Sequence, residues 1–166
     1  LRRRFGFIEL MPDSSVLGEA VVSGIPLGPW LDALNQRICQ YVGRDARNLQ
    51  VGHAYFLEDG KPVTTIPRLS RIVREDLIPL LQEYCYEDYM ALENILGKGL
   101  VDGQGQGIKE HVFESDAQAG LIAALLQPCP DLSTSISATA SADELEEEVD
   151  EELEDSGDDD LESADA

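Results

Sequence analysis

The sequence predicts a mainly α-helical domain followed by a disordered acidic tail, and three features of the chain carry this prediction. Apolar residues recur at steps of three and four in residues 30–42, 67–84 and 87–96, which places them on one face of a helix. Residues 5–10 are apolar at alternating positions and predict one short strand. Residues 141–166 hold 15 acidic residues and no lysine or arginine.

The acidic character of the chain is concentrated in this last segment. The whole chain has a formal net charge of -21, yet residues 1–140 carry only 18 of its 33 acidic residues against all 12 lysines and arginines. A block of like charges repels itself and stays solvated, so we expect residues 131–166 to be disordered. Such a tail either keeps the protein in solution or competes with DNA for a basic surface.

Cysteine spacing and hydropathy exclude several classes of protein. Cys39, Cys85 and Cys129 are far apart and odd in number, and no CxxC pair or Cys/His spacing indicates a metal site. No apolar run approaches the ~20 residues that span a bilayer, and no signal peptide is visible. We therefore expect reduced thiols, no metal ligands, no membrane contact and a cytoplasmic location. The abrupt start leads us to expect a fragment of a longer protein.

The first half of the chain divides at turn-forming residues. Residues 13–29, rich in glycine, proline and small polar side chains, are expected to link the strand to the first helix. That helix is expected to begin at Pro29, whose missing N–H would have no partner in a first turn, and to stop at Gly43. A compact apolar segment at residues 49–56 and a turn at residues 58–62 follow.

The second half alternates helical and glycine-rich segments. Pro79 lies inside a helical pattern, so that helix must kink or restart there. The last helix is expected to be capped by Asp116 or Ser115, and order is expected to fade beyond Pro128. The expected elements are helices at residues 67–84, 87–96 and 116–127, with a turn and a brief extended piece within residues 99–107.

Four segments stand out by their order and spacing. They are LRRRF at residues 1–5, LNQRI at 34–38, VGHAYF at 51–56 and IVREDLIPLLQEYCYED at 72–88. Together they resemble the C-terminal part of McrB-type AAA+ NTPases, the motor subunits of modification-dependent restriction systems. In that family the corresponding segments read approximately LRRRF, LN-x-RI, IGHSYF and I-x-PLL-x-EY-x-x-ED.

The resemblance covers about residues 1–100 and implies an architecture. It implies that the strand is the last one of an α/β P-loop core, and that a small helical lid follows it. The chain contains no GxxxxGK[ST] loop, so the phosphate-binding core would lie upstream. The expected parts are the end of the core at residues 1–12, a linker at 13–29, the lid at 30–100, a C-terminal extension with a short helix at 101–130 and the acidic tail at 131–166.

The resemblance assigns a role to the arginines at the start of the chain. In a ring of AAA+ subunits, arginines at this place reach the γ-phosphate bound by the neighbouring subunit. We expect Arg3 and Arg4 to act in this way, and Arg2 is the third candidate. The alternative is that the three arginines keep an edge strand soluble, or that one of them pairs with a nearby carboxylate.

The resemblance also places Gly52, His53 and Tyr55 near the nucleotide, on the side of the lid. Ala54 stands where the family often has serine, so a hydroxyl contact is lost. The functional hypothesis is that His53 contacts the base, ribose or phosphate. The alternative is that His53 is a hydrogen-bonded packing residue, as a lone histidine in an apolar segment commonly is.

Other polar side chains are expected to have structural roles. The acidic and amide side chains between residues 82 and 88 are expected to form a solvated helix face, although paired carboxylates can catalyse acid–base chemistry. His111 is expected to lie on the surface. The residues expected to pack within the lid are Tyr84, Tyr86 and Tyr89.

The function implied by the resemblance is that of an ATP- or GTP-hydrolysing subunit. Nucleotide and Mg²⁺ would be bound mainly by the upstream core, and the full-length protein would form a homo-oligomeric, hexameric ring. A nuclease or effector subunit is a possible partner, and DNA would be engaged indirectly. This chain alone would not be an enzyme. The alternative is a non-catalytic helical interaction module whose acidic tail binds a basic partner.

Overall fold

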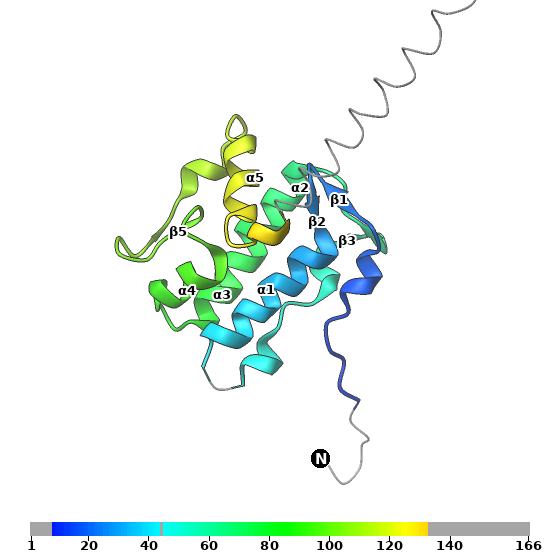
Figure 1. Ribbon diagram of the computed structural model, residues 1–166, viewed down its shortest axis with the longest axis horizontal. Helices are drawn as coiled ribbons and strands as arrows, with labels where there is room; N and C mark the ends of the chain where they lie inside the picture. The colour runs from blue at the N-terminus through cyan, green and yellow to red at the C-terminus, as the bar shows by residue number, and fades with distance from the viewer. Residues whose placement is uncertain (1–7, 44, 133–166) are drawn as a thin grey trace, which may run out of the picture. The chain divides into compact units, whose positions relative to one another are not determined.

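The computed structural model describes residues 8–43 and 45–132, and these form a mainly helical domain (Figure 1). Short 3₁₀ helices and three two-stranded antiparallel hairpins connect the longer helices. The α-helices are α1 (Leu27–Tyr41), α2 (Ile66–Arg71), α3 (Ile78–Tyr84), α4 (Tyr89–Leu96) and α5 (Gln118–Leu126). The hairpins are β1–β2 (Val21–Val22 and Ile25–Pro26), β3–β4 (Leu57–Glu58 and Lys61–Pro62) and β5–β6 (Val101–Asp102 and Gly107–Ile108). The remaining helical segments are η1 (Ser14–Leu17), η2 (Ala46–Leu49), η3 (His53–Phe56), η4 (Ile72–Leu77) and η5 (Glu110–Phe113).

Helix α1 lies at the centre of this domain (Figure 1). Its apolar residues recur with the helical period, and Trp30, Leu31, Leu34 and Ile38 are all buried. The helix begins at Leu27, slightly before the expected start, and Pro29 lies in its first turn, where a missing N–H has no helical partner. The helix predicted at residues 30–42 is therefore confirmed.

The strand expected at residues 5–10 is not seen in its described part. Residues 8–13 form no strand, and the side chains of Ile8 and Leu10 are 87% and 90% exposed. Residues 5–7 lie outside the described part of the chain. The physical reason is pairing: no described segment forms backbone hydrogen bonds to residues 8–10, and a strand without a neighbour has no ladder to stabilise it.

Residues 13–29, expected to be a linker, are instead folded into the domain. They form η1 and the hairpin β1–β2, and Leu17, Val22 and Ile25 are almost completely buried. The two turn residues Ser23 and Gly24 both have positive φ, 49° and 83°, which matches the right-handed twist of a tight hairpin. Glycine, proline and small polar residues are typical of linkers, but they also form tight hairpin turns. The prediction of a linker is therefore wrong.

The long helix from Ile66 to Tyr84 changes type before Pro79. The segment η4 is a π-helix, and α3 restarts at Ile78, so the predicted restart near Pro79 is confirmed. In a regular α-helix the proline ring would clash with the carbonyl four residues earlier, at Glu75. The wider turn of the π-helix relieves this clash.

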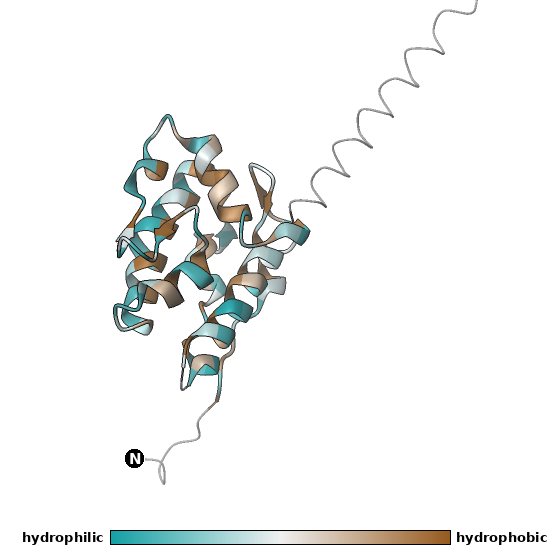
Figure 2. Ribbon diagram, turned by 60° about the vertical axis from the view of Figure 1, so that its left-hand side comes forward, coloured by the Kyte–Doolittle hydropathy of each residue, from teal (hydrophilic) through white to brown (hydrophobic). Residues whose placement is uncertain are grey.

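The C-terminal segment belongs to the same core as the lid helices. Helix α5 is hydrophobic along most of its length (Figure 2), and its Leu121 and Leu125 are buried in one cluster with α1. The residue before α5 is Ala117, with no side-chain cap, so the prediction of a cap at Asp116 or Ser115 is wrong. Cys129 is buried as well, so packing continues past Pro128, where order was expected to fade.

One hydrogen bond closes this core between distant parts of the sequence. The indole Nε1–H of Trp30 donates to the carbonyl oxygen of Leu125 over 2.9 Å, and the same ring meets Phe56 edge to face with centroids 6.0 Å apart. Residues 101–130, expected to be a C-terminal extension with a short helix, therefore complete the interior of the domain.

Replacing Trp30 with phenylalanine is expected to lower the free energy of unfolding by about 1–3 kcal/mol, because the Leu125 carbonyl loses its buried donor. Trp30 is the chain's one tryptophan, so unfolding in urea is followed by circular dichroism rather than fluorescence. Tyr41→Phe, which removes a polar atom from a 40% exposed ring on the same helix, is the control. Equal stability of the two variants would contradict the role of this hydrogen bond.

Candidate functional site

His53 is the predicted site residue that the structure connects most directly to another segment. It begins η3, whose Phe56 is fully buried and anchors the segment in the core. The backbone N–H of Asp13 donates to His53 Nδ1 over 3.1 Å. Because Nδ1 accepts this bond, the imidazole carries its proton on Nε2, which can donate to a ligand. The histidine thus joins the start of η1 to η3.

Asp13 adds negative charge beside this imidazole. Its carboxylate accepts hydrogen bonds from the hydroxyl and the backbone N–H of Ser15, and these bonds, with a smaller contribution from His53, lower the pKa of Asp13. The ionised carboxylate makes the position next to His53 unfavourable for a phosphate and favourable for hydroxyl or N–H donors.

Asn35 holds this segment in place from α1. It is the one buried polar residue in the described part of the chain, 6% exposed. Its Oδ1 accepts from the N–H of Val51 over 2.7 Å, and its Nδ2 donates to the carbonyl of Val51 over 2.9 Å. These two bonds fix the backbone two residues before His53. They join the LNQRI and VGHAYF segments in space, a relation that sequence reasoning missed.

Arg37 of the same segment has a structural role. Its Nε donates to the carbonyl of Ile95 over 2.7 Å, and its Nη1 lies 3.2 Å from the carbonyl of Pro128 and 3.0 Å from Cys129 Sγ. The guanidinium therefore ties α1 to the end of α4 and to the segment after α5. Because its N–H groups already make these contacts within the domain, the guanidinium has a structural role and is not a candidate for binding a ligand.

Gly52 and Tyr55, the other two expected site residues, lie on either side of this position. A Cβ at Gly52 would meet no atom closer than 4.0 Å, so packing within the described domain does not require glycine here. Tyr55 is 39% exposed. Burial and, second, the neighbouring Tyr55 raise the pKa of Tyr84, which places Tyr55 close to α3. Glycine and tyrosine are thus available on the surface next to His53.

A small polar pocket lies against the same face of α1. Its volume is about 200 Å³, and Ser14 Oγ donates to Asp32 Oδ2 over 2.8 Å beside it. No lysine or arginine is among its described lining residues, so these offer no cation to a phosphate. Those residues are Pro12, Asp32, Asn35, Gln36, Cys39 and Gln50.

The other residues singled out in the sequence are placed as follows. Arg2, Arg3 and Arg4 lie outside the described residues. Asp88 caps α4 by accepting from the N–H groups of Met90 and Ala91, each over 3.0 Å. Gln82, Glu83, Glu87 and His111 are half-buried or exposed, in agreement with the expected solvated surface. Within residues 8–43 and 45–132 no group of His, Cys, Asp and Glu side chains could hold a metal ion.

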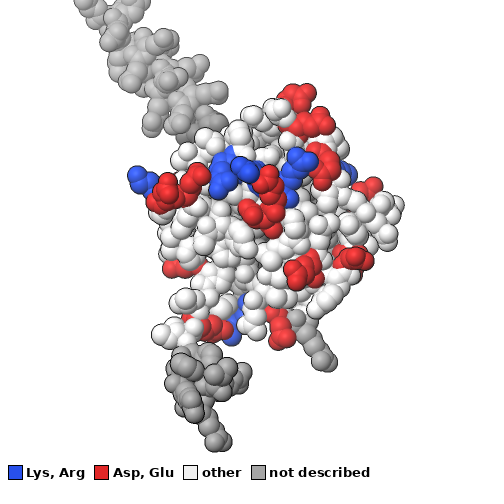
Figure 3. Space-filling view, turned by 180° about the vertical axis from the view of Figure 1, so that it is seen from behind, with Lys and Arg blue, Asp and Glu red and all other residues white. Residues whose placement is uncertain are grey.

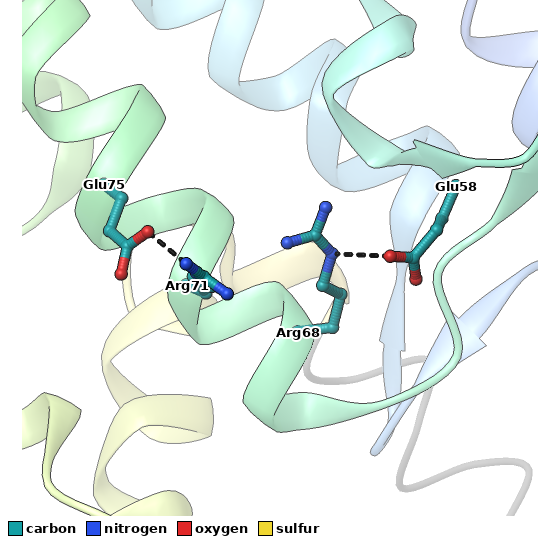
Figure 4. A network of polar contacts seen from close by, with 4 residues as sticks. All are labelled: Glu58, Arg68, Arg71 and Glu75. Carbon is teal, nitrogen blue, oxygen red and sulfur yellow. Dashed lines mark hydrogen bonds and ion pairs between the residues drawn. The ribbon is translucent and has the colours of Figure 1, made fainter.

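Four arginines on the described surface are paired with carboxylates. Figure 3 shows lysines and arginines in a band with acidic residues between them. Arg71 bonds Glu75 over 2.8 Å, whereas Arg68 Nε lies 3.6 Å from Glu58, an ion pair without a hydrogen bond (Figure 4). Arg74 pairs with Glu110 over 2.8 Å. This surface is mixed in charge and does not form a basic patch of the kind that tracks a phosphate backbone.

The described residues form a small helical domain, and comparison with known proteins shows which family it resembles. Residues 26–93 match the family described as McrB, alpha-helical lid domain. The chain is also 32% identical over 100 residues to the type IV methyl-directed restriction enzyme EcoKMcrB subunit of Escherichia coli (strain K12), a match that covers 53% of this chain and 22% of the relative. Residues 26–93 are therefore similar to a McrB α-helical lid, as the sequence resemblance implied.

The chain spans about a fifth of the length of this relative, at 22%. No solved structure matches the chain. Among the described helices none is long and apolar enough to cross a membrane.

Proposed function

We propose that this chain is the lid-bearing C-terminal part of a McrB-like AAA+ NTPase, and that it works with an upstream P-loop core that binds ATP or GTP with Mg²⁺. The observation that carries the proposal is the match of residues 26–93 to the McrB lid family, supported by the 32% identity to a McrB subunit. In this proposal residues 1–12 end the core, and the full-length protein assembles into a ring that supports restriction of DNA with a nuclease subunit.

His53 is proposed to contact the nucleotide from the lid at its base or ribose. The bond from Asp13 to Nδ1 orients the imidazole and leaves Nε2–H as a donor. The ionised carboxylate of Asp13 disfavours a phosphate at the same place, whereas a ribose hydroxyl suits both groups, because it can accept from Nε2–H and donate to the carboxylate. The phosphates and Mg²⁺ would be held by the upstream core.

Replacing Gly52 with alanine in the full-length protein is expected to weaken nucleotide binding about tenfold while leaving the free energy of unfolding within about 0.5 kcal/mol. Within the described domain the added Cβ meets no atom closer than 4.0 Å, so a closely approaching ligand is expected to be affected while the fold is not. Binding is measured by titration with a fluorescent nucleotide, and stability by urea unfolding of the same preparation.

His53→Ala is the companion variant. It is expected to weaken nucleotide binding by a similar factor, since both the Nε2 donor and the orientation by Asp13 are lost. Exposed His111→Ala is the matched control and is expected to leave affinity unchanged. If His53→Ala lowers stability but keeps the affinity of the folded fraction, His53 is a packing residue and the nucleotide contact is refuted.

The NTPase and the alternative, a non-catalytic interaction module, predict different sequences upstream of Leu1. A GxxxxGK[ST] loop and an acidic strand end within roughly 200 residues upstream of Leu1 are expected for the NTPase. An upstream reading frame with neither feature would remove the NTPase proposal and leave the interaction module.

A further inference from the structure

A second cavity, whose lining does not include His53, lies at the C-terminal end of α1. It has a volume of about 440 Å³ and opens between the C-terminal end of α1 and the turn that joins α3 to α4. None of the lining residues that the structure describes is a lysine or arginine. They are Tyr41, Val42, Gly43, Asp45, Leu49, Tyr84, Cys85, Tyr86, Asp88 and Ala91.

Three tyrosines are among the residues that line this pocket. Tyr41 is 40% exposed and Tyr86 is 91% exposed, while Tyr84 is half-buried. The prediction that Tyr86 packs within the lid is therefore wrong. It fails because the chain turns sharply at Tyr86 and carries the ring out of the helix pattern that placed it inside.

The backbone holds Tyr86 in this position at an energetic cost. Tyr86 and Glu87 have consecutive positive φ angles of 49° and 65°, and Asp45 across the pocket has 65°. Residues other than glycine avoid this region, at a cost of about 1–3 kcal/mol each when the surrounding structure forces it. The bond from the N–H of Asp88 to the carbonyl of Cys85, 2.9 Å long, closes the turn.

The rim of the pocket is acidic. Asp45 and Asp88 lie on it, and both capping bonds of Asp88 use Oδ1, so Oδ2 is free to accept another donor. Between Arg74 and Lys98 the sequence has six acidic residues and no basic one. Burial, and second the charge of Asp88, raise the pKa of Cys85 to about 11, so the thiol on the floor is neutral. An anion is repelled here and a cation is attracted.

We propose that this pocket binds an arginine side chain presented by a partner protein. Its planar cation would lie against the faces of Tyr41 and Tyr86, and its N–H groups would donate to the carboxylates of Asp45 and Asp88. The methylene stem would pack on Val42, Leu49 and Ala91 at the floor. Lysine has no planar face to stack and makes the weaker ligand. This site is independent of the nucleotide proposal.

The test uses the ¹⁵N-labelled chain of 166 residues and three blocked peptides, acetyl-Gly-Arg-Gly-amide and its lysine and glutamate equivalents. The arginine peptide is expected to give saturable shifts at the amides of Asp45, Tyr86 and Ala91, with weaker binding of the lysine peptide and no binding of the glutamate peptide. The titration is repeated with Arg44→Ala, because Arg44 lies between two lining residues in the sequence and could compete with the peptide.

Variants separate a built site from general attraction to an acidic protein. Tyr86→Ala and Asp45→Asn are each expected to weaken arginine-peptide binding about fivefold or more. Glu83→Gln removes the same charge from an exposed residue outside the pocket and is expected to change binding less than twofold. The proposal is overturned if no saturable shifts occur at the pocket, if the glutamate peptide binds equally, or if Glu83→Gln weakens binding as much as Asp45→Asn.

Discussion

Replacing Asn35 with alanine is expected to lower the free energy of unfolding by about 2–5 kcal/mol, because it removes both hydrogen bonds to Val51 at once. Asn35 is 6% exposed and Val51 is 1% exposed, so water does not reach either unpaired group without opening the core. A loss of this size is a large part of the 5–15 kcal/mol that typically stabilises a domain.

Besides lowering the overall stability, Asn35→Ala is expected to have a local effect at Val51. The Val51 N–H loses its acceptor, so its hydrogen exchange is expected to become much faster than that of amides elsewhere in the core. Gln36→Ala is the matched control, since it changes an exposed neighbour on the same helix and is expected to alter stability by no more than about 0.5 kcal/mol. Equal unfolding midpoints of the two variants, measured in urea, would show that the Asn35 bonds contribute nothing.

Replacing Arg3 or Arg4 with alanine in the full-length protein is expected to cut NTP turnover by about 10³-fold or more while leaving nucleotide affinity near normal. An arginine supplied to a neighbouring site stabilises charge that develops in the transition state, and such residues contribute about 10³–10⁵ in rate. Turnover is measured as phosphate release, and affinity by nucleotide titration under the same conditions. Arg2→Ala, the third candidate, is compared in the same assay.

Mixing experiments test whether these arginines act on a neighbouring subunit. A subunit with Arg3→Ala and an intact upstream P-loop is combined with one that keeps its arginines but has a disabled P-loop. Turnover is expected to recover in the mixture, because an active site and an intact arginine then meet at some interfaces. Normal turnover of both alanine variants alone would sink the finger role, and a mixture without recovery would place the arginines in their own subunit's site.

Local sequence signals predicted the helices because each signal acts within one turn or two. The period of apolar residues placed α1, and Asp-Gly between β3 and β4 predicted the turn at residues 58–62, where both residues have positive φ, 50° and 75°. Pro79 predicted a restart, and the π-helix η4 and α3 provide it. None of these features depends on which distant segment lies nearby.

The wrong predictions concern segments whose structure depends on contacts with distant parts of the chain. The strand at residues 5–10 was inferred from alternation, and its described part has no neighbour with which to form a ladder. Residues 13–29 were read as a linker, although Leu17 and Ile25 are buried by α1 and its neighbours. Tyr86 was assigned to the core from its spacing, but two consecutive left-handed residues turn it into solvent.

The sequence by itself determined that this chain is mainly helical, where most of its helices lie and that it resembles the McrB lid, since period, turn residues and motif order are properties of the linear chain. Only the tertiary structure decided how His53 is held, how α5 closes the core and which tyrosines surround a pocket. These depend on single hydrogen bonds across long separations, from Asp13 to His53, from Asn35 to Val51 and from Trp30 to Leu125. Such bonds join one side chain to one backbone group, and a backbone group carries no signature of its partner in the sequence.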